Sequence, residues 1–322
     1  MTSAMNMNSA ADASKPLHIA FGVDANYFLG MGVAMVSVLE NNRGQPLIFH
    51  VLTPSISDEN AARLRQLEAR YGTEIKVHII DPSIFDEFAV FPSFSQYSAA
   101  IFSRLLIAGT LQGVADKVLY LDADIVCQGS VAELMAIDID DVVVAAVGDV
   151  GSIAEKQIAT LQLSHQRYFN SGVLYINVDK WMASDVWHGA VRAILGASKK
   201  FSFPDQDALN IVLDGRAKLL PPKFNWMYDL FGETSSGKKI AKEALFVHFV
   251  GRLKPWHNWC CNPENQLFLK YKAISPWADA VLYPPKNYKE IRMYSQGLRK
   301  SGRQLQGWLW YAKFVLNKFS AK

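Results

Sequence analysis

The chain has 322 residues, half of them apolar and a fifth charged, which is ordinary for a folded globular protein. It contains no run of about 18 apolar residues, and its polar start lacks the apolar core of a signal peptide, so we expect neither a membrane span nor secretion. The net charge of +3 divides into +8 for residues 286–322 and −5 for the rest, which predicts a basic tail on a mildly acidic body.

The three cysteines are Cys127, Cys260 and Cys261, and their spacing fits neither a disulfide framework nor a zinc site. A reducing compartment is therefore expected, which favours the cytoplasm. No recognised nucleic-acid-binding module occurs, so nucleic acid is not an expected partner.

Strands and helices alternate along the chain. Residues 1–16 look disordered, and residues 148–167, which show no strong periodicity, are predicted to form a mobile loop. The predicted strands are 17–23, 47–52, 75–80, 117–126, 141–147, 168–177 and 244–250. The predicted helices are 29–40, 58–71, a short one after Ser130, and 97–111, 180–196 and one from Asp205. This alternation predicts an α/β fold with a mainly parallel sheet.

The run from Lys117 to Val126 is an apolar strand interrupted by Asp122 and Asp124. Side chains at positions i and i+2 point to the same side of an extended chain, so the two carboxylates can converge. Because two ionised carboxylates repel each other, a hard divalent cation between them is the natural partner. The alternative is a turn at the end of a strand, with one aspartate bonded to its own backbone.

His248 lies inside the late apolar strand, where a lone histidine is most often a satisfied core residue. The residues that follow, from Gly251 to Lys254, resemble a loop that could hold phosphate. With Asp122 and Asp124, His248 would supply two oxygens and one nitrogen, a set that suits Mn²⁺ better than Ca²⁺. Lys254, together with Arg104 among its apolar neighbours, would add positive charge near a diphosphate.

Ligands of such sheets bind outside the carboxyl ends of the strands. Asp24, Asn26 and Tyr27 follow the first strand, and Asp122 and Asp124 follow another, so these groups could face one crevice. The first strand is not followed by Gly-x-Gly-x-x-Gly, and no Walker A loop occurs, which disfavours a dinucleotide dehydrogenase or a P-loop enzyme.

Two further segments carry polar side chains beside predicted elements. Asn170 and Ser171 open a strand next to Gly172, where small residues let a ligand approach the backbone. Asp205 follows a proline at the start of a helix, so its simplest role is that of an N-cap.

Taken in order, these motifs resemble those of glycosyltransferase family 8. The quoted segments are Gly22-Val23-Asp24-Ala25-Asn26-Tyr27, Tyr120-Leu121-Asp122-Ala123-Asp124, Phe169-Asn170-Ser171-Gly172-Val173, Asp205-Gln206-Asp207 and His248-Phe249-Val250-Gly251-Arg252-Leu253-Lys254-Pro255-Trp256. The resemblance covers residues 17–277 and is strongest to the bacterial lipopolysaccharide core galactosyl- and glucosyltransferases. The basic aromatic segment 278–322 resembles the C-terminal extension of that subgroup.

The resemblance implies a GT-A fold, a UDP-hexose donor, Mn²⁺ or Mg²⁺ as cofactor, a lipid A-core oligosaccharide acceptor and retention of anomeric configuration. Matched by position, the metal ligands are Asp122, Asp124 and His248. The matched donor-binding residues are Gly22, Asp24, Asn26, Tyr27, Arg104, Ala123, Asn170, Ser171, Gly251 and Lys254. Asp205 and Gln206 match the pair at the reacting face, and some relatives have Asn-Ala where this chain has Asn170-Ser171.

The chemistry of transfer and the reaction class keep alternatives. Gln206 is a poor nucleophile, so a covalent route would use Asp205 or Asp207; otherwise the acceptor attacks on the leaving-group side, with the diphosphate as base. A metal-dependent phosphoesterase, a non-catalytic carbohydrate-binding module and a self-glucosylating enzyme are the rival functions.

The tail also has two interpretations. Apolar and aromatic residues recur at helical spacing from Leu305 to Phe319, with Arg and Lys between them. The helix could pack on the body, or it could lie on the anionic inner leaflet as a peripheral membrane contact. Basic charge together with Trp and Tyr favours the membrane. The sequence indicates neither the sugar nor the oligomeric state.

Overall fold

The computed structural model describes residues 15–85, 99–197, 201–232, 239–320. The predicted disordered segment 1–16 lies almost entirely outside this part, as do residues 97–98 of a predicted helix. Within the described residues, no helix combines the length and the apolarity that crossing a membrane requires.

The core of the molecule is a seven-stranded sheet with the strand order β3-β2-β1-β4-β7-β6-β8. Its strands are β1 (Leu17–Gly22), β2 (Leu47–Thr53), β3 (Glu74–Ile79), β4 (Lys117–Leu121), β6 (Val144–Gly148), β7 (Phe169–Asn177) and β8 (Ala217–Leu220). Strands β3, β2, β1 and β4 run parallel, and β7 runs antiparallel to both β4 and β6. The mainly parallel α/β sheet predicted from the alternation of elements is confirmed.

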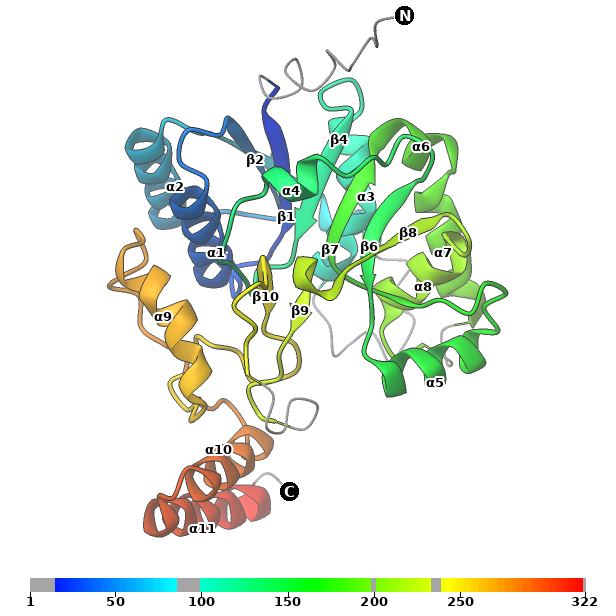
Figure 1. Ribbon diagram of the computed structural model, residues 1–322. Coiled ribbons are helices and arrows are strands. Elements are labelled where there is room, and N and C mark those ends of the chain that lie inside the picture. Colours follow the sequence, from blue (N-terminus) through cyan, green and yellow to red (C-terminus); the bar gives the residue numbers. More distant parts are fainter. Residues whose placement is uncertain (1–14, 86–98, 198–200, 233–238, 321–322) are drawn as a thin grey trace, which may run out of the picture.

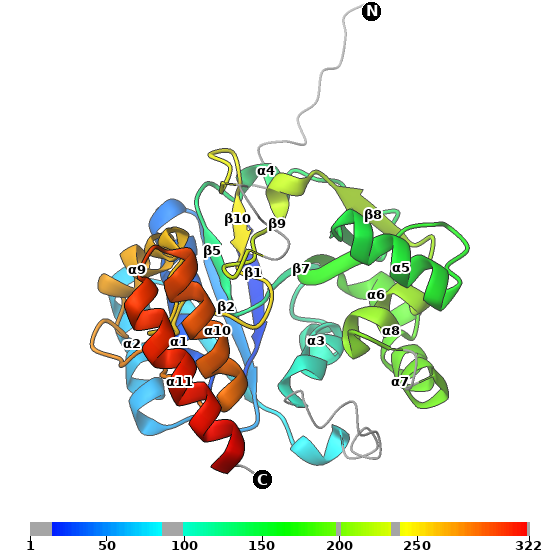
Figure 2. The ribbon, with the colours of Figure 1, turned by 90° about the horizontal axis from the view of Figure 1, so that it is seen from below.

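Helices cover both faces of this sheet (Figures 1 and 2). One side carries α1 (Phe28–Asn41), α2 (Asp58–Tyr71) and α9 (Gln266–Ala273), and the other carries α3 (Ser103–Leu111), α6 (Val178–Ala183), α7 (Val186–Ala197) and α8 (Pro204–Val212). Ile19 and Phe21 of β1 face the first side, whereas Ala20 faces the second. This alternation of side chains gives two apolar cores, one on each face of the sheet.

A smaller sheet follows the end of β4. It consists of β5 (Ile125–Cys127), β10 (Phe246–His248) and β9 (Trp226–Met227), in that order. The single strand predicted for residues 117–126 is therefore wrong, because the chain leaves the large sheet after Leu121 and pairs with β10 from Ile125 on. Asp122 and Asp124 lie in the turn between the two sheets.

Two other sequence predictions are corrected. Residues 148–167 contain the helix α5 (Gly151–Leu161), which ends at Gln162 in the left-handed conformation. The helix predicted for residues 180–196 is two helices, α6 and α7, separated by Asp185 with φ of 48°. In both cases the ends depend on backbone conformations that side-chain periodicity does not encode.

The remaining short elements are α4 (Ala132–Met135), η4 (Ala99–Phe102), η6 (Pro222–Phe224) and η7 (Pro263–Asn265). The tail forms a pair of packed helices, α10 (Tyr288–Lys300) and α11 (Gln304–Ser320), at the end of the molecule beyond the small sheet (Figure 1). Close packing at Gly307, where a Cβ would lie 3.0 Å from the carbonyl oxygen of Ser295, brings the two helices together.

Candidate active site

The polar side chains predicted to converge lie where β1 and β4 end and where β7 begins. Asp24, Asn26 and Tyr27 follow β1, and the Asp24 carboxylate accepts the backbone N–H of Asn26 at 2.8 Å, which shapes the turn. Gly22 is the last residue of β1. Because β1 and β4 are parallel neighbours, this turn and the Asp122–Asp124 turn lie at the same edge of the sheet.

Asp122, Asp124 and His248 form one cluster, in which one ligand atom from each residue lies within 4.8 Å of the others. The Nε2 atom of His248 lies 3.2 Å from Oδ1 of Asp124 and 3.7 Å from Oδ2 of Asp122. Asp124 and His248 are buried, whereas Asp122 is partly exposed. The backbone allows this approach because residue 172 is glycine: a Cβ there would collide with the His248 ring and lie 3.0 Å from Asp122 Oδ2.

The donor set fits a divalent cation. Oδ1 of Asp124 is buried and has no hydrogen-bond donor. It faces Nε2 of His248, whose Nδ1 atom lies 3.0 Å from Oδ1 of Asn225. When Nδ1 carries the proton of a neutral imidazole, two lone pairs face each other, which is unfavourable unless a proton or a metal ion lies between them.

Lys254 occupies the other side of Asp124. Its Nζ atom donates to Oδ2 of Asp124 and, at 3.1 Å, to the carbonyl oxygen of Phe249. Burial alone would raise the pKa of Asp124, but the Lys254 ammonium opposes this effect, and that pKa lies below its usual range. The carboxylate therefore stays ionised and available as a ligand.

The loop that carries Lys254 begins at Gly251, which has φ of +85°. A Cβ at Gly251 would also approach Asp229 Oδ1 to 3.5 Å. Trp256 packs edge-on against Tyr27, with ring centroids 5.7 Å apart, and a Cβ on Gly30 would lie 2.5 Å from the Trp256 ring. These contacts bring the turn after β1 and the loop after β10 to the same place.

Arg104 is the buried cation on the opposite side of the cluster. Its guanidinium donates to Asp122 Oδ1 at 2.8 Å, to Ser171 Oγ at 2.6 Å and to the Ser171 carbonyl oxygen at 2.9 Å, and its Nε lies 3.1 Å from Asp205 Oδ2. Burial opposes the charge of Arg104, but the two aspartates raise its pKa. Burial also raises the pKa of Asp205, although Arg104 counteracts this effect.

Tyr120 also binds the cluster, although the sequence analysis gave it no role. Its hydroxyl donates to Oδ1 of Asp122, the same oxygen that accepts from Arg104, and its ring lies 4.9 Å from the Arg104 guanidinium carbon. Asp122 thus offers its second oxygen, Oδ2, towards His248.

Gln206 and Asp207 begin α8 but point to different surroundings. Gln206 accepts the Ser171 N–H at 3.0 Å and donates to Asp149 Oδ2 at 2.7 Å. Asp207 is fully buried and accepts four hydrogen bonds, from Gln157, Tyr168, Ser202 and Phe203. With both oxygens of Asp207 occupied, its geometry favours a structural role.

Two site residues, Asp149 and Asn225, lie outside the recognised motifs, and Tyr120 lies inside one but was assigned no role from the sequence. Asp149 comes directly after β6, and Asn225 precedes β9 in an apolar run between Phe224 and Trp226. A buried polar residue inside such a run was the available signal for Asn225, which is only 1% exposed.

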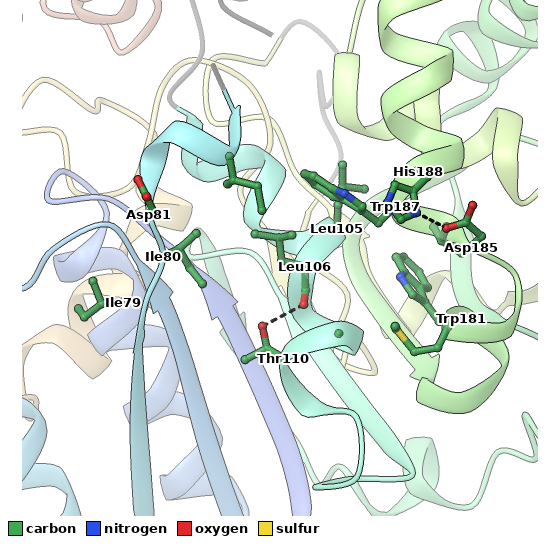
Figure 3. Close-up of a pocket in the computed structure, with 14 residues that line it drawn as sticks. Ile79, Ile80, Asp81, Leu105, Leu106, Thr110, Trp181, Asp185, Trp187 and His188 are labelled. Atoms are coloured by element: carbon green, nitrogen blue, oxygen red, sulfur yellow. Dashed lines mark hydrogen bonds and ion pairs between the residues drawn. The ribbon is translucent and has the colours of Figure 1, made fainter. Parts of the chain in front are cut away.

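A separate cavity of about 520 Å³ lies between the end of β3, α3 and the α6–α7 corner (Figure 3). Ile80, Leu105, Leu106, Trp181 and Trp187 line it, together with an Asp185–His188 pair at 2.5 Å. None of the predicted site residues lines this cavity. It is an apolar space beside the polar cluster.

A second cluster of ionisable groups crosses three strands of the large sheet. Nδ1 of His18 lies 2.9 Å from Nε2 of His50, and Nδ1 of His50 lies 3.0 Å from Nε2 of His78. Consecutive rings are stacked, with centroids 5.2 and 5.3 Å apart. Burial, and then the neighbouring imidazoles and Lys76, lower the pKa of His50 to about 3.

Comparison with known proteins finds near-full-length relatives. The chain is 33% identical over 94% of its length to the lipopolysaccharide glucosyltransferase WaaO of Escherichia coli K12, covering 91% of that protein. It is 32% identical over 97% of its length to the lipopolysaccharide 1,3-galactosyltransferase of Salmonella typhimurium LT2, covering 94% of it.

A solved structure also resembles the chain. The galactosyltransferase LgtC, crystallised with donor and acceptor sugar analogues, superposes with a TM-score of 0.70 at 26% identity, over 80% of this chain and 96% of that one. The architecture is thus the expected GT-A fold. The pattern of glycosyl transferase family 8 matches residues 18–260, and its C-terminal pattern matches residues 263–318. The chain therefore belongs to glycosyl transferase family 8.

Proposed function

We propose that this protein transfers galactose or glucose from a UDP-sugar to the outer-core oligosaccharide of lipopolysaccharide. The names of the two near-full-length relatives support the acceptor class and the hexose. The observation that carries the proposal is the cluster of Asp122, Asp124 and His248, in which a buried carboxylate oxygen without a donor faces an imidazole nitrogen.

Asp122, Asp124 and His248 would hold Mn²⁺ or Mg²⁺. Such an ion supplies Lewis acidity and charge that stabilise the departing nucleoside diphosphate. Lys254 adds a fixed positive charge beside Asp124 and is held there by the Phe249 carbonyl, so it would bind the same diphosphate. Gly251 permits the left-handed backbone that starts this loop, so the loop N–H groups can face phosphate oxygens.

The turn after β1 would bind the nucleotide. Asp24 and Asn26 offer acceptors and donors for uracil and ribose, and Tyr27 offers a ring face for the base beside Trp256. Gly22 and Ala123 are small residues at the two strand ends, so ligand can approach the backbone there.

The donor sugar would lie over Arg104, Asn170, Ser171, Asp205 and Gln206. Retention is proposed to proceed on the leaving-group face, where a diphosphate oxygen takes the proton of the acceptor hydroxyl. Three contacts favour this route over a covalent one: Asp205 is paired with Arg104, the Gln206 carbonyl accepts the Ser171 N–H, and Asp207 has no vacant oxygen. These contacts make each of the three groups a weaker nucleophile.

A donor screen tests the proposal. The protein is incubated with UDP-glucose, UDP-galactose or UDP-N-acetylglucosamine in Mn²⁺, with and without truncated core lipopolysaccharide, and UDP release is measured. We expect one UDP-hexose to give release that depends on the acceptor and is lost with chelator. Release that ignores the acceptor would instead identify a hydrolase, and acceptor binding without release would identify a carbohydrate-binding module.

We also propose that the protein is cytoplasmic and contacts the anionic inner membrane surface through α10 and α11. Large apolar side chains of α11 are exposed, among them Leu305 (76%), Leu309 (65%) and Leu316 (69%), and Trp308 is 56% exposed. Several Lys and Arg residues lie on the same helix pair. Exposed apolar side chains together with basic residues are typical of interfacial helices.

Liposome flotation tests the membrane contact. The intact chain should float with vesicles containing anionic phospholipid, and a variant with Leu305, Leu309 and Leu316 replaced by Ser should remain in the soluble fraction. These substitutions leave the folded body complete, unlike truncation after residue 285. Equal flotation of both proteins would rule out this surface.

A further inference from the structure

A chain of hydrogen bonds connects the backbone of β7 to the candidate metal ligand His248. It begins at the backbone N–H of Gly172, which donates to Oδ1 of Asn170 at 3.0 Å. Nδ2 of Asn225 donates to the same Asn170 oxygen at 2.9 Å. The other amide atom of Asn225, Oδ1, lies 3.0 Å from Nδ1 of His248.

This chain has only one consistent direction. A backbone N–H can only donate, so the Asn170 atom facing Gly172 must be its oxygen. The Asn225 atom facing that oxygen must then be the amide nitrogen, which leaves the Asn225 oxygen facing His248. Nδ1 of His248 therefore carries a proton, and the lone pair of a neutral ring is on Nε2.

The tautomer of His248 determines whether its Nε2 atom carries a proton towards Asp124. Nε2 lies 3.2 Å from the buried Oδ1 of Asp124, which has no other donor. If the proton were on Nε2, the ring would donate it to Asp124 in a hydrogen bond. Neither Nε2 nor that lone pair of Asp124 Oδ1 would then be available to a cation. Asn225 prevents this internal hydrogen bond by engaging Nδ1.

We infer that Asn225 is a positioning residue: it holds His248 in the Nδ1–H tautomer and so keeps Nε2 and Asp124 Oδ1 available to a divalent cation. The inference rests on the metal site of the proposed function and extends it. Asn225 is 1% exposed and lies between η6 and β9, so solvent does not compete for its amide. Outer hydrogen bonds of this kind orient ligating histidines in metal sites.

The same chain reaches the proposed donor-sugar side of the site. Asn170 is the shared acceptor in the middle, and the Gly172 carbonyl also accepts the Asp122 N–H at 2.8 Å. Two of the three proposed metal ligands, Asp122 directly and His248 through Asn225, are therefore connected by hydrogen bonds to residues 170–172 of β7. Rotation of Asn170 towards a sugar would withdraw an acceptor from both Gly172 and Asn225.

The first test needs no substitution. Nitrogen-15 spectra of the metal-free, full-length protein at a pH where the imidazole is neutral report which ring nitrogen of His248 is protonated. The signal is assigned by its absence in His248→Gln. We expect protonated Nδ1 and unprotonated Nε2; the reverse pattern would overturn the inference, whatever the protein's activity.

The second test measures Mn²⁺ affinity without donor, by the loss of the free-ion electron spin resonance signal. Asn225→Leu keeps the branched shape of the side chain but removes both hydrogen bonds, so we expect about 10- to 100-fold weaker binding and a shift towards the Nε2–H tautomer. Asn225→Asp keeps the acceptor for Nδ1–H but sets its second oxygen against Asn170 Oδ1, so it should keep the Nδ1–H tautomer and bind Mn²⁺ more tightly than Asn225→Leu.

The matched control is Asn42→Leu. Asn42 is also buried and makes comparable bonds, to Val38, Gly129 and Val131, but it belongs to the far end of α1. It should lower thermal stability and leave Mn²⁺ affinity unchanged. Unchanged Mn²⁺ affinity in Asn225→Leu would refute the positioning role. If the parent protein bound no Mn²⁺, the metal dependence in the proposed function would be refuted. The nitrogen-15 spectrum would still determine the tautomer of His248.

Discussion

This protein contains two groups of ionisable side chains that differ in how their hydrogen-bond donors and acceptors are paired. In the ladder of His18, His50 and His78, each close contact joins two ring nitrogens that share one proton. In the active-site cluster, Asp124 Oδ1 and His248 Nε2 face each other with no donor between them. The ladder is complete as it stands, whereas the cluster lacks a proton or a metal ion between these two atoms.

The number of protons on the three imidazoles explains why the ladder needs no ligand. Two links among three imidazoles hold two protons, and a third proton fits on an outer nitrogen of a neutral ladder. One further proton can be added at the other outer nitrogen without breaking a link. Clustering of histidines and acids is therefore weak support for a ligand site; acceptors that face each other unmatched are stronger.

Replacing a histidine by leucine in each group should give the largest difference in activity between the cluster and the ladder. His248→Leu removes a proposed ligand, so we expect sugar transfer to fall by at least about 100-fold, in the range found when one transition-state-stabilising group is lost. His50→Leu removes the middle of the ladder and should leave transfer at neutral pH within about twofold. Comparable activity losses in the two folded variants would show that the distinction is wrong.

A glycine at the cluster allows a second test. Gly172→Ala would push its new Cβ into the His248 ring, 2.7 Å from Nδ1, so Mn²⁺ affinity should fall about 10-fold or more. Gly109→Ala is the control, because it lies within α3 and its nearest neighbour, Met182 Sδ, is 4.0 Å away. It should keep Mn²⁺ affinity and raise the unfolding free energy by up to about 1 kcal/mol.

The ladder should appear in the pH dependence of stability. Burial lowers the pKa of His50 from 6.5 to about 3, so the unfolded chain takes up this proton before the folded one. The contribution of His50 to the free energy of unfolding is therefore complete above pH 6.5. It declines by about 1.4 kcal/mol per pH unit as the pH falls towards 3. Denaturant unfolding at pH 7.5, 6.0 and 5.0 should give a shallower loss for His50→Leu than for the parent; equal slopes would contradict the assignment.

The smallest expected effect concerns Asp149, which orients Gln206. Asp149→Asn keeps an acceptor but removes the charge from the 2.7 Å bond to the Gln206 amide. A charged hydrogen bond exceeds a neutral one by about 1 kcal/mol, so we expect about fivefold lower kcat/KM. Asp138→Asn, an exposed carboxylate outside the site, is the control. A parent-like kcat/KM for Asp149→Asn would show that Gln206 keeps its orientation without that charge.

The sequence predicted the mainly parallel sheet and the residues of the cluster because both have short-range signals. Apolar strands ended in polar side chains, and Asp122 and Asp124 stood two residues apart within such a run. The end of β4 at Leu121 was not predictable, since the apolar run continues into the strand of another sheet. Periodicity records burial and does not record which strand is the neighbour.

Asn225 and α5 show the other limit. Asn225 acquires its role only through contacts with His248 and Asn170, which are distant in sequence. In α5, the one buried residue is Gln157, whose partner is Asp207, fifty positions later. The fully buried position of this helix is thus filled by a polar side chain whose partner is distant in the chain, and local patterns do not display such a contact.

The helix pair at the end of the chain touches the region that carries Lys254. Lys300 of α10 donates to the carbonyl oxygen of Phe231 at 3.2 Å and lies 4.5 Å from its ring centroid, and Leu253 lines the same junction. Tails of related enzymes are therefore not interchangeable modules. A chimera that exchanges residues after 285 must also carry the matching side chains at 231 and 253, so inheritance of the tail and of the loop that carries Lys254 should be linked.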